Sequence, residues 1–263
     1  MQIITPDFKL EKLFEEITSS PESVLFLDYD GTLAPFRIQR DKAVPYPGIR
    51  ELLNGIIKKS KSRVVIISGR WTRDLIPLLN LDEKPEIWGS HGWERFYPDG
   101  RYEIAEMDEK ALKGLADADK IIEDLKLTPW CEQKPGSLAI HWRGMNDKDI
   151  EILRERLLPL LNPIAFDSGL TVKEFDGGLE LRVPGRDKGD AVNTILGEMN
   201  EGIPTAYLGD DLTDEDAFNA LKGRGYSILV RKEYRPTAAD LWLKPPGELM
   251  SFLDQWLKRT SKS

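Results

Sequence analysis

The sequence predicts an α/β fold built on a doubly wound, mostly parallel sheet, with a smaller α+β domain inserted into it. Two observations carry this prediction. Short runs rich in Val, Ile and Leu recur along the chain, and each is followed by a segment of helical character. The middle of the chain, from about residue 108 to residue 183, departs from this alternation. We therefore expect one large core domain and one insert.

The core strands are predicted at residues 24–27, 63–67, 205–208 and 226–230. Continuous apolar runs of this kind suit parallel strands that are covered on both faces, and the helices between them supply the crossovers. Helices are expected at residues 48–59, 71–80, 188–200, 213–222 and 246–259. The last of these carries Leu249, Phe252, Leu253, Trp256 and Leu257 at helical spacing.

The insert reads as helix 108–126, strand 137–143, helix 147–160 and strands 163–167, 171–175 and 178–183. Such strands would need antiparallel neighbours in a parallel sheet, so we predict a separate α+β domain at residues 108–183. The core domain then comprises residues 1–107 and 184–263. The alternative is an antiparallel extension at the edge of the same sheet.

Composition excludes several functional classes. The chain has 263 residues, with 37 Lys and Arg against 45 Asp and Glu, and this net charge of −8 gives no support to nucleic-acid binding. Cys131 is the single cysteine, which excludes an internal disulfide and a multi-cysteine metal site. No apolar run approaches the ~18 residues of a membrane span, and no signal sequence begins the chain, so we expect a cytoplasmic protein without a membrane partner.

Acidic and hydroxyl side chains follow the predicted core strands at their carboxyl ends. Asp28 and Asp30 follow the first strand, Ser68 and Arg70 the second, and Gly209-Asp-Asp-Leu-Thr-Asp214 the third. Because ligands of open parallel sheets bind beyond the carboxyl ends of the strands, we expect these side chains to share one edge.

Asp28 and Asp30 are two residues apart, so they can project to the same side as the strand ends. One carboxylate of such a pair can attack a phosphate as a nucleophile while its neighbour donates a proton to the leaving oxygen. A calcium loop is the alternative, but Leu33 and Gln39 stand where that loop needs Gly and Glu.

Asp210, Asp211 and Asp214 would repel one another without a cation, and Mg²⁺ is the expected partner. Asp214 also has a structural alternative, because Thr213 and Asp216 resemble a helix N-terminal capping box. We expect no such structural role for Asp210 or Asp211.

Ser68 and Lys188 are candidate phosphate contacts. Ser68 can donate its hydroxyl to a phosphate oxygen, or it can cap the helix that begins nearby. Lys188 opens the helix at residues 188–200 and would balance charge in the transition state, although a lysine there can equally be a surface residue.

In this order, these residues resemble the four motifs of the haloacid dehalogenase superfamily: Asp28-x-Asp30-Gly-Thr-Leu, Ser68, Lys188 and Gly209-Asp210-Asp211 with Asp214. The resemblance implies a Rossmann-like core with an inserted cap. It also implies that Asp28 accepts the phosphoryl group, that Asp30 is the general acid and base, and that Asp28, the backbone of Asp30 and Asp210 bind Mg²⁺.

Further motifs resemble the trehalose-6-phosphate phosphatase family over about residues 22–256: Ser68-Gly-Arg70, Gly89-Ser-His91-Gly92, Glu132-x-Lys134-x-x-Ser137, Glu180-x-Arg182 and Lys188-Gly. The resemblance implies that Glu132, Lys134 and Ser137 of the cap contact the sugar and phosphate, with Arg70, His91 and Glu180 nearby. Trp142 and the Arg186-Asp187 pair depart from the family pattern, which leaves the identity of the sugar open.

The expected activity is Mg²⁺-dependent hydrolysis of trehalose 6-phosphate. The alternatives are the same chemistry on another sugar phosphate, such as sucrose phosphate, or a non-catalytic sugar-phosphate sensor. We expect a monomer whose partner is a small sugar phosphate, with association with a trehalose-6-phosphate synthase as a further expectation. Structural alternatives also stay open: a solvated strand face for the three cap residues, and packing for His141, His91 and the aromatic residues Trp93, Phe96 and Tyr97.

Overall fold

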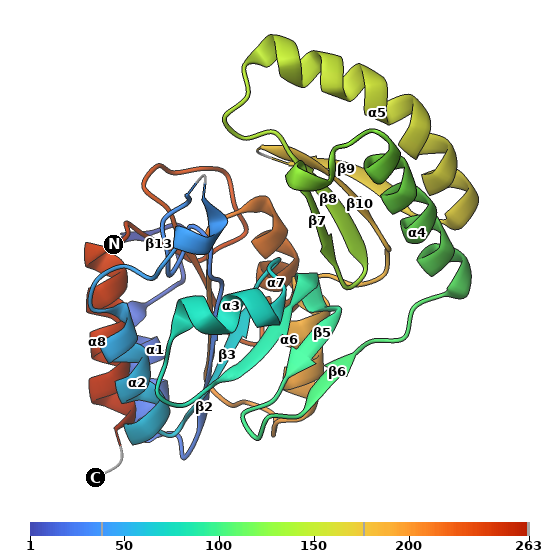
Figure 1. Cartoon of the computed structure of the whole chain (residues 1–263). Helices are drawn as coiled ribbons and strands as arrows, with labels where there is room; N and C mark the ends of the chain where they lie inside the picture. Colours follow the sequence, from blue (N-terminus) through green and yellow to red (C-terminus); the bar gives the residue numbers. More distant parts are fainter. Residues whose placement is uncertain (38, 176, 262–263) are drawn as a thin grey trace. The chain divides into compact units, whose positions relative to one another are not determined.

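The computed structural model describes residues 1–37, 39–175 and 177–261. The chain divides into two compact units (Figure 1): unit 1 comprises Met1–Glu103 and Asp187–Ser263, and unit 2 comprises Ile104–Arg186. Unit 2 is thus inserted into the chain of unit 1. The expected boundaries, at residues 107/108 and 183/184, lie a few residues from the divisions at 103/104 and 186/187.

Unit 1 contains a nine-stranded sheet with the order β1-β13-β12-β11-β2-β3-β4-β5-β6. The strands are β1 (Gln2–Ile3), β2 (Ser23–Leu27), β3 (Ser62–Ile67), β4 (Glu86–Gly89), β5 (Glu94–Phe96), β6 (Tyr102–Ile104), β11 (Thr205–Gly209), β12 (Tyr226–Val230) and β13 (Leu241–Leu243). Neighbours from β13 to β4 are parallel, whereas β1 and β5 pair antiparallel with β13 and β4. The predicted parallel α/β core is confirmed.

Helices cover both faces of this sheet. One hydrophobic cluster joins it to α1 (Leu10–Ser19), α2 (Ile49–Lys59), α3 (Thr72–Leu79) and α8 (Gly247–Thr260), and a second joins it to α6 (Lys188–Gly197) and α7 (Glu215–Leu221). In β2, Leu25 and Leu27 belong to the first cluster, and Val24 and Phe26 to the second. This alternation explains why the whole strand is apolar. Within the described ranges, no helix is both long and apolar enough to cross a membrane.

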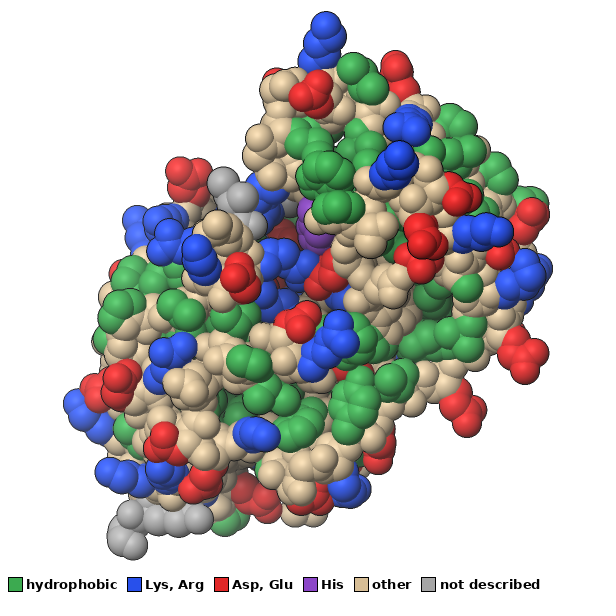
Figure 2. All heavy atoms as spheres, in the orientation of Figure 1, with side chains coloured by type: hydrophobic (Ala, Val, Ile, Leu, Met, Phe, Trp, Pro, Cys, Tyr) green, Lys and Arg blue, Asp and Glu red, His purple; other side chains and the backbone are tan. Residues whose placement is uncertain are grey.

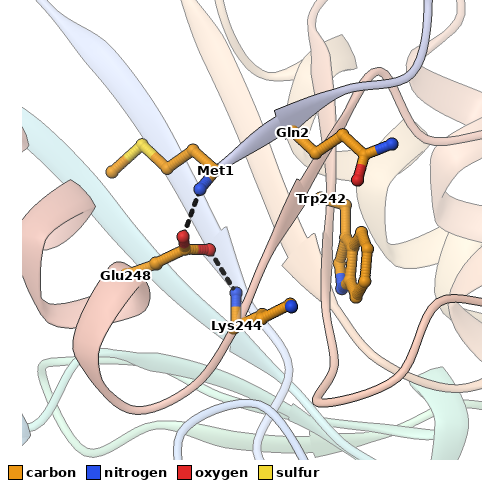
Figure 3. A pocket seen from close by; sticks show the side chains of 5 residues that line it. All are labelled: Met1, Gln2, Trp242, Lys244 and Glu248. Atoms are coloured by element: carbon orange, nitrogen blue, oxygen red, sulfur yellow. Dashed lines mark hydrogen bonds and ion pairs between the residues drawn. The ribbon is translucent and has the colours of Figure 1, made fainter.

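An ion pair between the amino group of Met1 and Glu248 stabilises the β1 edge of this sheet. Gln2 of β1 pairs with Trp242 of β13. Figure 3 shows the amino group of Met1 and the backbone N–H of Lys244 both reaching the carboxylate of Glu248 in the first turn of α8. The short strand β1 is therefore held by side-chain contacts as well as by its backbone hydrogen bonds.

Unit 2 contains a four-stranded antiparallel sheet with the order β7-β8-β10-β9. Its elements are α4 (Glu109–Asp124), β7 (Cys131–Lys134), β8 (Ser137–His141), α5 (Asp147–Ser168), β9 (Thr171–Phe175) and β10 (Gly178–Arg182). Helices α4 and α5 pack on each other and on this sheet. Because its sheet is separate from that of unit 1, the alternative of an edge extension is wrong.

The strand predicted at residues 163–167 is also wrong, because α5 continues to Ser168 through Pro159 and Pro163. Leu157, Leu161 and Ala165 recur every four residues and are buried. Burial of this stripe outweighs the loss of the backbone hydrogen bonds that the two prolines cannot donate.

Candidate active site

The two central strands of unit 1 bring Asp28 and Asp210 together. β2 and β11 are parallel neighbours, and the order of strands reverses at this point, because β3 lies on the other side of β2. The backbone N–H of Asp28 donates to the carbonyl oxygen of Leu208 at 2.8 Å, so β2 and β11 end together. This is the position at which open α/β sheets bind ligands.

Three carboxylates and one ammonium group form the centre of the site. Oxygen atoms of Asp28, Asp210 and Asp214 lie within 4.8 Å of one another, and all three residues are buried. Lys188, at the first position of α6, places its Nζ 2.7 Å from Asp28 Oδ1 and 2.6 Å from Asp214 Oδ1. Lys188 is 3% exposed, so the reading of it as a surface residue is wrong.

Asp214 is saturated by donors. Its Oδ1 accepts hydrogen bonds from Lys188 and from the hydroxyl of Tyr207, at 2.6 Å each. Its Oδ2 accepts the backbone N–H groups of Asp210 and Asp211, at 2.9 Å each. Asp214 is thus suited to fix the loop after β11 and the position of Lys188.

Asp28 Oδ2 and Asp210 Oδ1 are buried and have no hydrogen-bond partner among the residues that the structure describes. Gly31 leaves room for Asp210, because it has a φ of 87° and a Cβ on it would lie 2.1 Å from Asp210 Oδ2. Buried carboxylate oxygens without donors are costly unless a cation meets them. The pair therefore fits a hard divalent cation such as Mg²⁺.

The protonation of this cluster reflects its burial. Burial raises the pKa of Asp28 to about 7, with Lys188 acting against this rise and Asp214 adding to it. Burial also raises the pKa of Asp210 well above its ordinary value, with Asp28 and Asp214 contributing. The pKa of Lys188 is lowered by burial but raised overall by Asp214 and Asp28. Lys188 therefore stays charged.

Asp30 and Arg70 form a two-pronged ion pair. Arg70 Nε lies 2.6 Å from Asp30 Oδ2, and Arg70 Nη2 lies 2.7 Å from Asp30 Oδ1. The remaining Nη1 group donates to the carbonyl oxygen of Arg40. The fork thus fixes the orientation of the Asp30 carboxylate.

The loop after β3 and the turn after β4 are in direct contact. Ser68 Oγ accepts the backbone N–H of Arg70 at 3.1 Å, so it stabilises its own turn and does not cap α3. A Cβ on Gly69 would lie 2.6 Å from the His91 ring, so the glycine lets the imidazole approach the loop. Ser90 and His91 both have a positive φ, of 49° and 57°. Such backbone costs about 1 kcal/mol or more per residue and occurs preferentially at functional sites.

Asp211 lies outside the buried group. Its exposed side chain caps the turn η4 (Leu212–Asp214), where Asp211 and Asp214 form a reciprocal capping box. The expectation that Asp211 has no structural role is therefore wrong, as is the capping box expected between Thr213 and Asp216.

In unit 2, the predicted cap residues gather on one face of the sheet. Lys134 Nζ lies 3.1 Å from Glu180 Oε1 and 3.8 Å from Glu132 Oε2. Ser137 Oγ donates to Glu180 Oε1 at 2.8 Å, and His141 Nε2 lies 3.0 Å from Glu132 Oε2. The residues alternating with them, Leu138, Ile140, Leu179 and Leu181, are buried. A polar cluster of this kind matches a ligand rich in hydroxyl groups.

Sequence reasoning missed two residues near the site. Tyr207 lies within the apolar run of β11, and that run predicts a buried strand residue without indicating a role for the hydroxyl. Glu94 lies in the short strand β5, which was not predicted. The aromatic residues Trp93, Phe96 and Tyr97 belong to the hairpin of β4 and β5 and the residues beside it, with cation contacts from Lys84 to Phe96 and from Arg95 to Tyr97.

Comparisons with known proteins identify relatives of this chain. The chain is 32% identical over 247 residues to an uncharacterised glycosyl hydrolase of Mycobacterium tuberculosis, with coverage of 88% of this chain and 18% of that protein. It is 31% identical to probable trehalose-phosphate phosphatase 4 of Oryza sativa, with coverage of 95% and 71%. The chain thus spans less than a fifth of the mycobacterial relative and most of the plant one.

The solved structures include the C-terminal domain of the trehalose-6-phosphate phosphatase of C. albicans, with a TM-score of 0.78 at 22% identity over 98% of this chain and 99% of that domain. This likeness supports the fold. The family model described as trehalose-phosphatase matches residues 26–245, which contain all of the motifs discussed above. The chain therefore belongs to the trehalose-phosphatase family.

Proposed function

We propose that this protein is a phosphatase that hydrolyses trehalose 6-phosphate to trehalose and phosphate. The observation that carries the proposal is the buried Asp28 carboxylate, which keeps one oxygen without a donor while Lys188 holds the other. A nucleophile needs such a lone pair, and a charge-balancing ammonium beside it suits the transfer of an anionic group. Membership of the family supports the choice of substrate.

The chain's own residues perform the proposed reaction in two steps. One oxygen of the Asp28 carboxylate attacks phosphorus, and the bond to the sugar oxygen breaks while Asp30 donates a proton to that oxygen. Asp30 then takes a proton from water, which attacks the phosphorus of the aspartyl phosphate and releases phosphate and the free Asp28 carboxylate. Ser68 and Lys188 hold the phosphate oxygens. The fork with Arg70 would orient the Asp30 carboxylate for both proton transfers.

Asp28 and Asp210 are the side chains that would hold Mg²⁺, with the backbone carbonyl of Asp30 as a third ligand by resemblance to the superfamily. When bound, the ion would neutralise charge on the phosphate oxygens and orient the ester. Asp214 would keep its present role of fixing Lys188 and the loop after β11, because its oxygens are already occupied.

We also propose that unit 2 is the specificity cap and that Glu132, Lys134, Ser137 and Glu180 read the sugar hydroxyls. A disaccharide phosphate leaves fewer of these polar groups unpaired than a smaller ester does.

The decisive experiment measures phosphate release from trehalose 6-phosphate beside sucrose 6-phosphate, glucose 6-phosphate, glucosylglycerol phosphate and the mannosyl and glucosyl phosphoglycerates, with and without Mg²⁺. A Mg²⁺-dependent preference of about 100-fold for trehalose 6-phosphate, or ~2.7 kcal/mol of transition-state discrimination, is expected. Preference for another ester would reassign the cap. Activity on none of them would favour a sensor. Full activity of Asp28→Asn would overturn the assignment of Asp28 as the nucleophile.

Lys134→Ala tests the cap separately. It should reduce turnover of trehalose 6-phosphate far more than turnover of an aryl phosphate. The proposed contact of Lys134 is with the sugar, which the aryl phosphate lacks. Lys113→Ala, on an exposed site of α4, is the matched control and should change neither rate. Equal losses on both substrates would contradict the assigned pocket.

Association with a trehalose-6-phosphate synthase, a monomeric state and a cytoplasmic location stay predictions. Light scattering of the purified protein, alone and mixed with a synthase, tests the first two.

A further inference from the structure

A buried carboxylate outside the group of Asp28 joins two loops of the candidate active site. Glu94 is 1% exposed and begins β5, where it pairs with Gly89 at the carboxyl end of β4. It therefore lies at the sheet edge to which Asp28 and Ser68 belong. The proposed reaction does not use it.

The Glu94 carboxylate accepts four hydrogen bonds from three segments of unit 1. Oε1 accepts the backbone N–H of Thr72 at 2.8 Å and the hydroxyl of Ser90 at 2.9 Å. Oε2 accepts the hydroxyls of Thr72 and Tyr102, each at 2.8 Å. The start of α3, the turn after β4 and strand β6 are thus held by one side chain.

The backbone leaves a fitted space for this carboxylate. A Cβ on Gly89 would lie 2.3 Å from Glu94 Oε1 and 2.8 Å from the methyl carbon of Thr72. Gly89 therefore allows Glu94 and Thr72 to approach β4 closely.

The segments that Glu94 holds are those that carry the proposed substrate contacts. Thr72 follows Arg70 by two residues, and Ser90 directly precedes His91. The backbone N–H of Ser90 donates to the carbonyl oxygen of Arg70 at 2.8 Å, and that of His91 donates to the carbonyl oxygen of Ser68 at 3.1 Å. Two consecutive residues with positive φ do not keep this conformation unless their surroundings impose it.

We propose that Glu94 is a positioning residue, which holds the Ser68–Arg70 loop and the Ser90–His91 turn in the geometry that receives the sugar phosphate. This inference rests on the proposed function, because it takes these loops to contact the substrate. Glu94 acts through Ser68, Arg70 and His91.

Glu86 provides a matched control. It begins β4 at the opposite end of that strand, is 3% exposed, and accepts hydrogen bonds from Arg63, Arg95 and Trp88. Glu94→Ala and Glu86→Ala both remove a buried, fully hydrogen-bonded carboxylate from the same sheet, but only the first lies beside the site.

We expect Glu94→Ala to lower kcat/KM for trehalose 6-phosphate by 100-fold or more and to raise KM, since both loops lose their positions. Glu94→Gln should recover most of this activity. Its amide oxygen can accept hydrogen bonds and its NH₂ group can donate to the hydroxyls, which can rotate to accept them. Glu86→Ala should lower the melting temperature but keep kcat/KM of the folded protein within about twofold. Equal activity losses in the two alanine variants would overturn the proposal.

Should Glu94→Ala fail to fold, Glu94→Asp and Glu94→Gln decide the question. Asp keeps the charge but is one methylene too short to reach all three segments, so it should lose at least tenfold more activity than Gln. A greater loss in Gln would show that charge, and not position, matters, and would overturn the proposal.

A second readout does not depend on turnover. The chain has two histidines, so the ring resonances of His91 can be assigned by NMR with a His141→Gln variant. Glu94→Ala should shift or split the His91 resonances and leave those of His141 in place, and Glu86→Ala should affect neither. Unchanged His91 resonances in Glu94→Ala would overturn the positioning role even in an active enzyme. Absence of phosphatase activity in the unmodified protein would instead overturn the proposed function.

Discussion

The fork between Arg70 and Asp30 links substrate binding to proton transfer at the level of single residues. The guanidinium that holds Asp30 is also a proposed substrate contact, so an arriving phosphate ester would compete for it. Arg70→Lys keeps the charge but cannot form the fork, and we expect kcat/KM for trehalose 6-phosphate to fall by about 10- to 100-fold. Arg73→Lys, on the exposed surface of α3, should leave steady-state rates unchanged. A similar rate for Arg70→Lys and the unmodified enzyme would contradict this role.

Asp210 and Asp211 are neighbours with different expected behaviour. Asp210→Asn should raise the melting temperature without metal, because it removes a carboxyl group whose charged form is disfavoured by burial and by Asp28. It should also abolish the further rise on adding Mg²⁺. Asp211→Asn should retain the Mg²⁺ response, since Asp211 is exposed and caps a turn. Thermal unfolding with EDTA or Mg²⁺ measures both. An undiminished Mg²⁺ shift in Asp210→Asn would remove Asp210 from the proposed ligands.

The site residues at the strand ends could be predicted from the sequence, but the hydrogen bonds between them could not. Strand prediction and motif order placed Asp28, Ser68 and Asp210 at one edge, because parallel strands end together. The capping role of Asp211 and the four bonds of Glu94 depend on chain segments that are remote or irregular. No periodicity in the sequence encodes such contacts.

The N-terminal cap of helix α6 fixes the end of the helix that bears Lys188. Asp187 accepts the backbone N–H of Asp190 at 3.0 Å, and Asp190 accepts that of Asp187 at 2.9 Å. Asp187→Ala should lower the free energy of unfolding by about 1 kcal/mol, whereas Asp187→Asn should keep most of it. Activity of Asp187→Ala should also fall severalfold, because the end of the helix that bears Lys188 is loosened.

Urea unfolding with Asp108→Ala as the control separates the two effects. Asp108 caps α4 in unit 2, so its loss should cost similar stability. Activity of the folded Asp108→Ala variant should be unchanged; an equal loss of activity in both variants would count against a special role for the α6 cap.

The longer apolar strands were predicted well, and the short strands were not. The four core strands are five or six residues long in the structure, with buried apolar side chains. Strands β5 and β13 have three residues each, and β7 reads Cys-Glu-Gln-Lys, so neither length nor hydropathy distinguishes them from loops. They form because neighbouring strands offer hydrogen bonds. The predicted end of α5 at residue 160 was wrong, because the buried stripe of this helix continues to Ala165.

For the whole molecule, the buried carboxylates couple stability to pH and metal. Asp28 has a pKa of about 7 in the folded protein against an ordinary value of 3.8. Between about pH 4 and pH 7 the folded state therefore binds more protons than the unfolded state. The stability that protonated Asp28 contributes is lost as the pH rises from about 4 through 7. The pKa of Asp210 is shifted in the same direction.

The metal-free melting temperature should therefore fall between pH 5.5 and pH 8, and the Mg²⁺-induced rise should grow over the same interval, since fewer protons compete with the ion. Differential scanning fluorimetry with EDTA or Mg²⁺ at each pH measures both trends. A Mg²⁺ shift that is the same at every pH would contradict them.

The net charge of −8 opposes approach of an anionic substrate, so local charge must attract it. Figure 2 shows acidic and basic side chains interspersed over much of the visible face. The cations that matter are then the few beside Asp28, above all Lys188 and Arg70.

The insertion of unit 2 has a consequence for the order in which the protein is made. A ribosome releases β2 to β6 first, then the whole of unit 2, and only afterwards α6 and β11. Until β11 emerges, the central strand β2 has an open edge, and such an edge invites pairing with other chains. The nascent chain must keep this edge shielded while more than 80 further residues are translated. Asp28 meets Lys188 and Asp210 only after the whole of unit 2 has been translated, so no product that is truncated before β11 can carry the reactive centre.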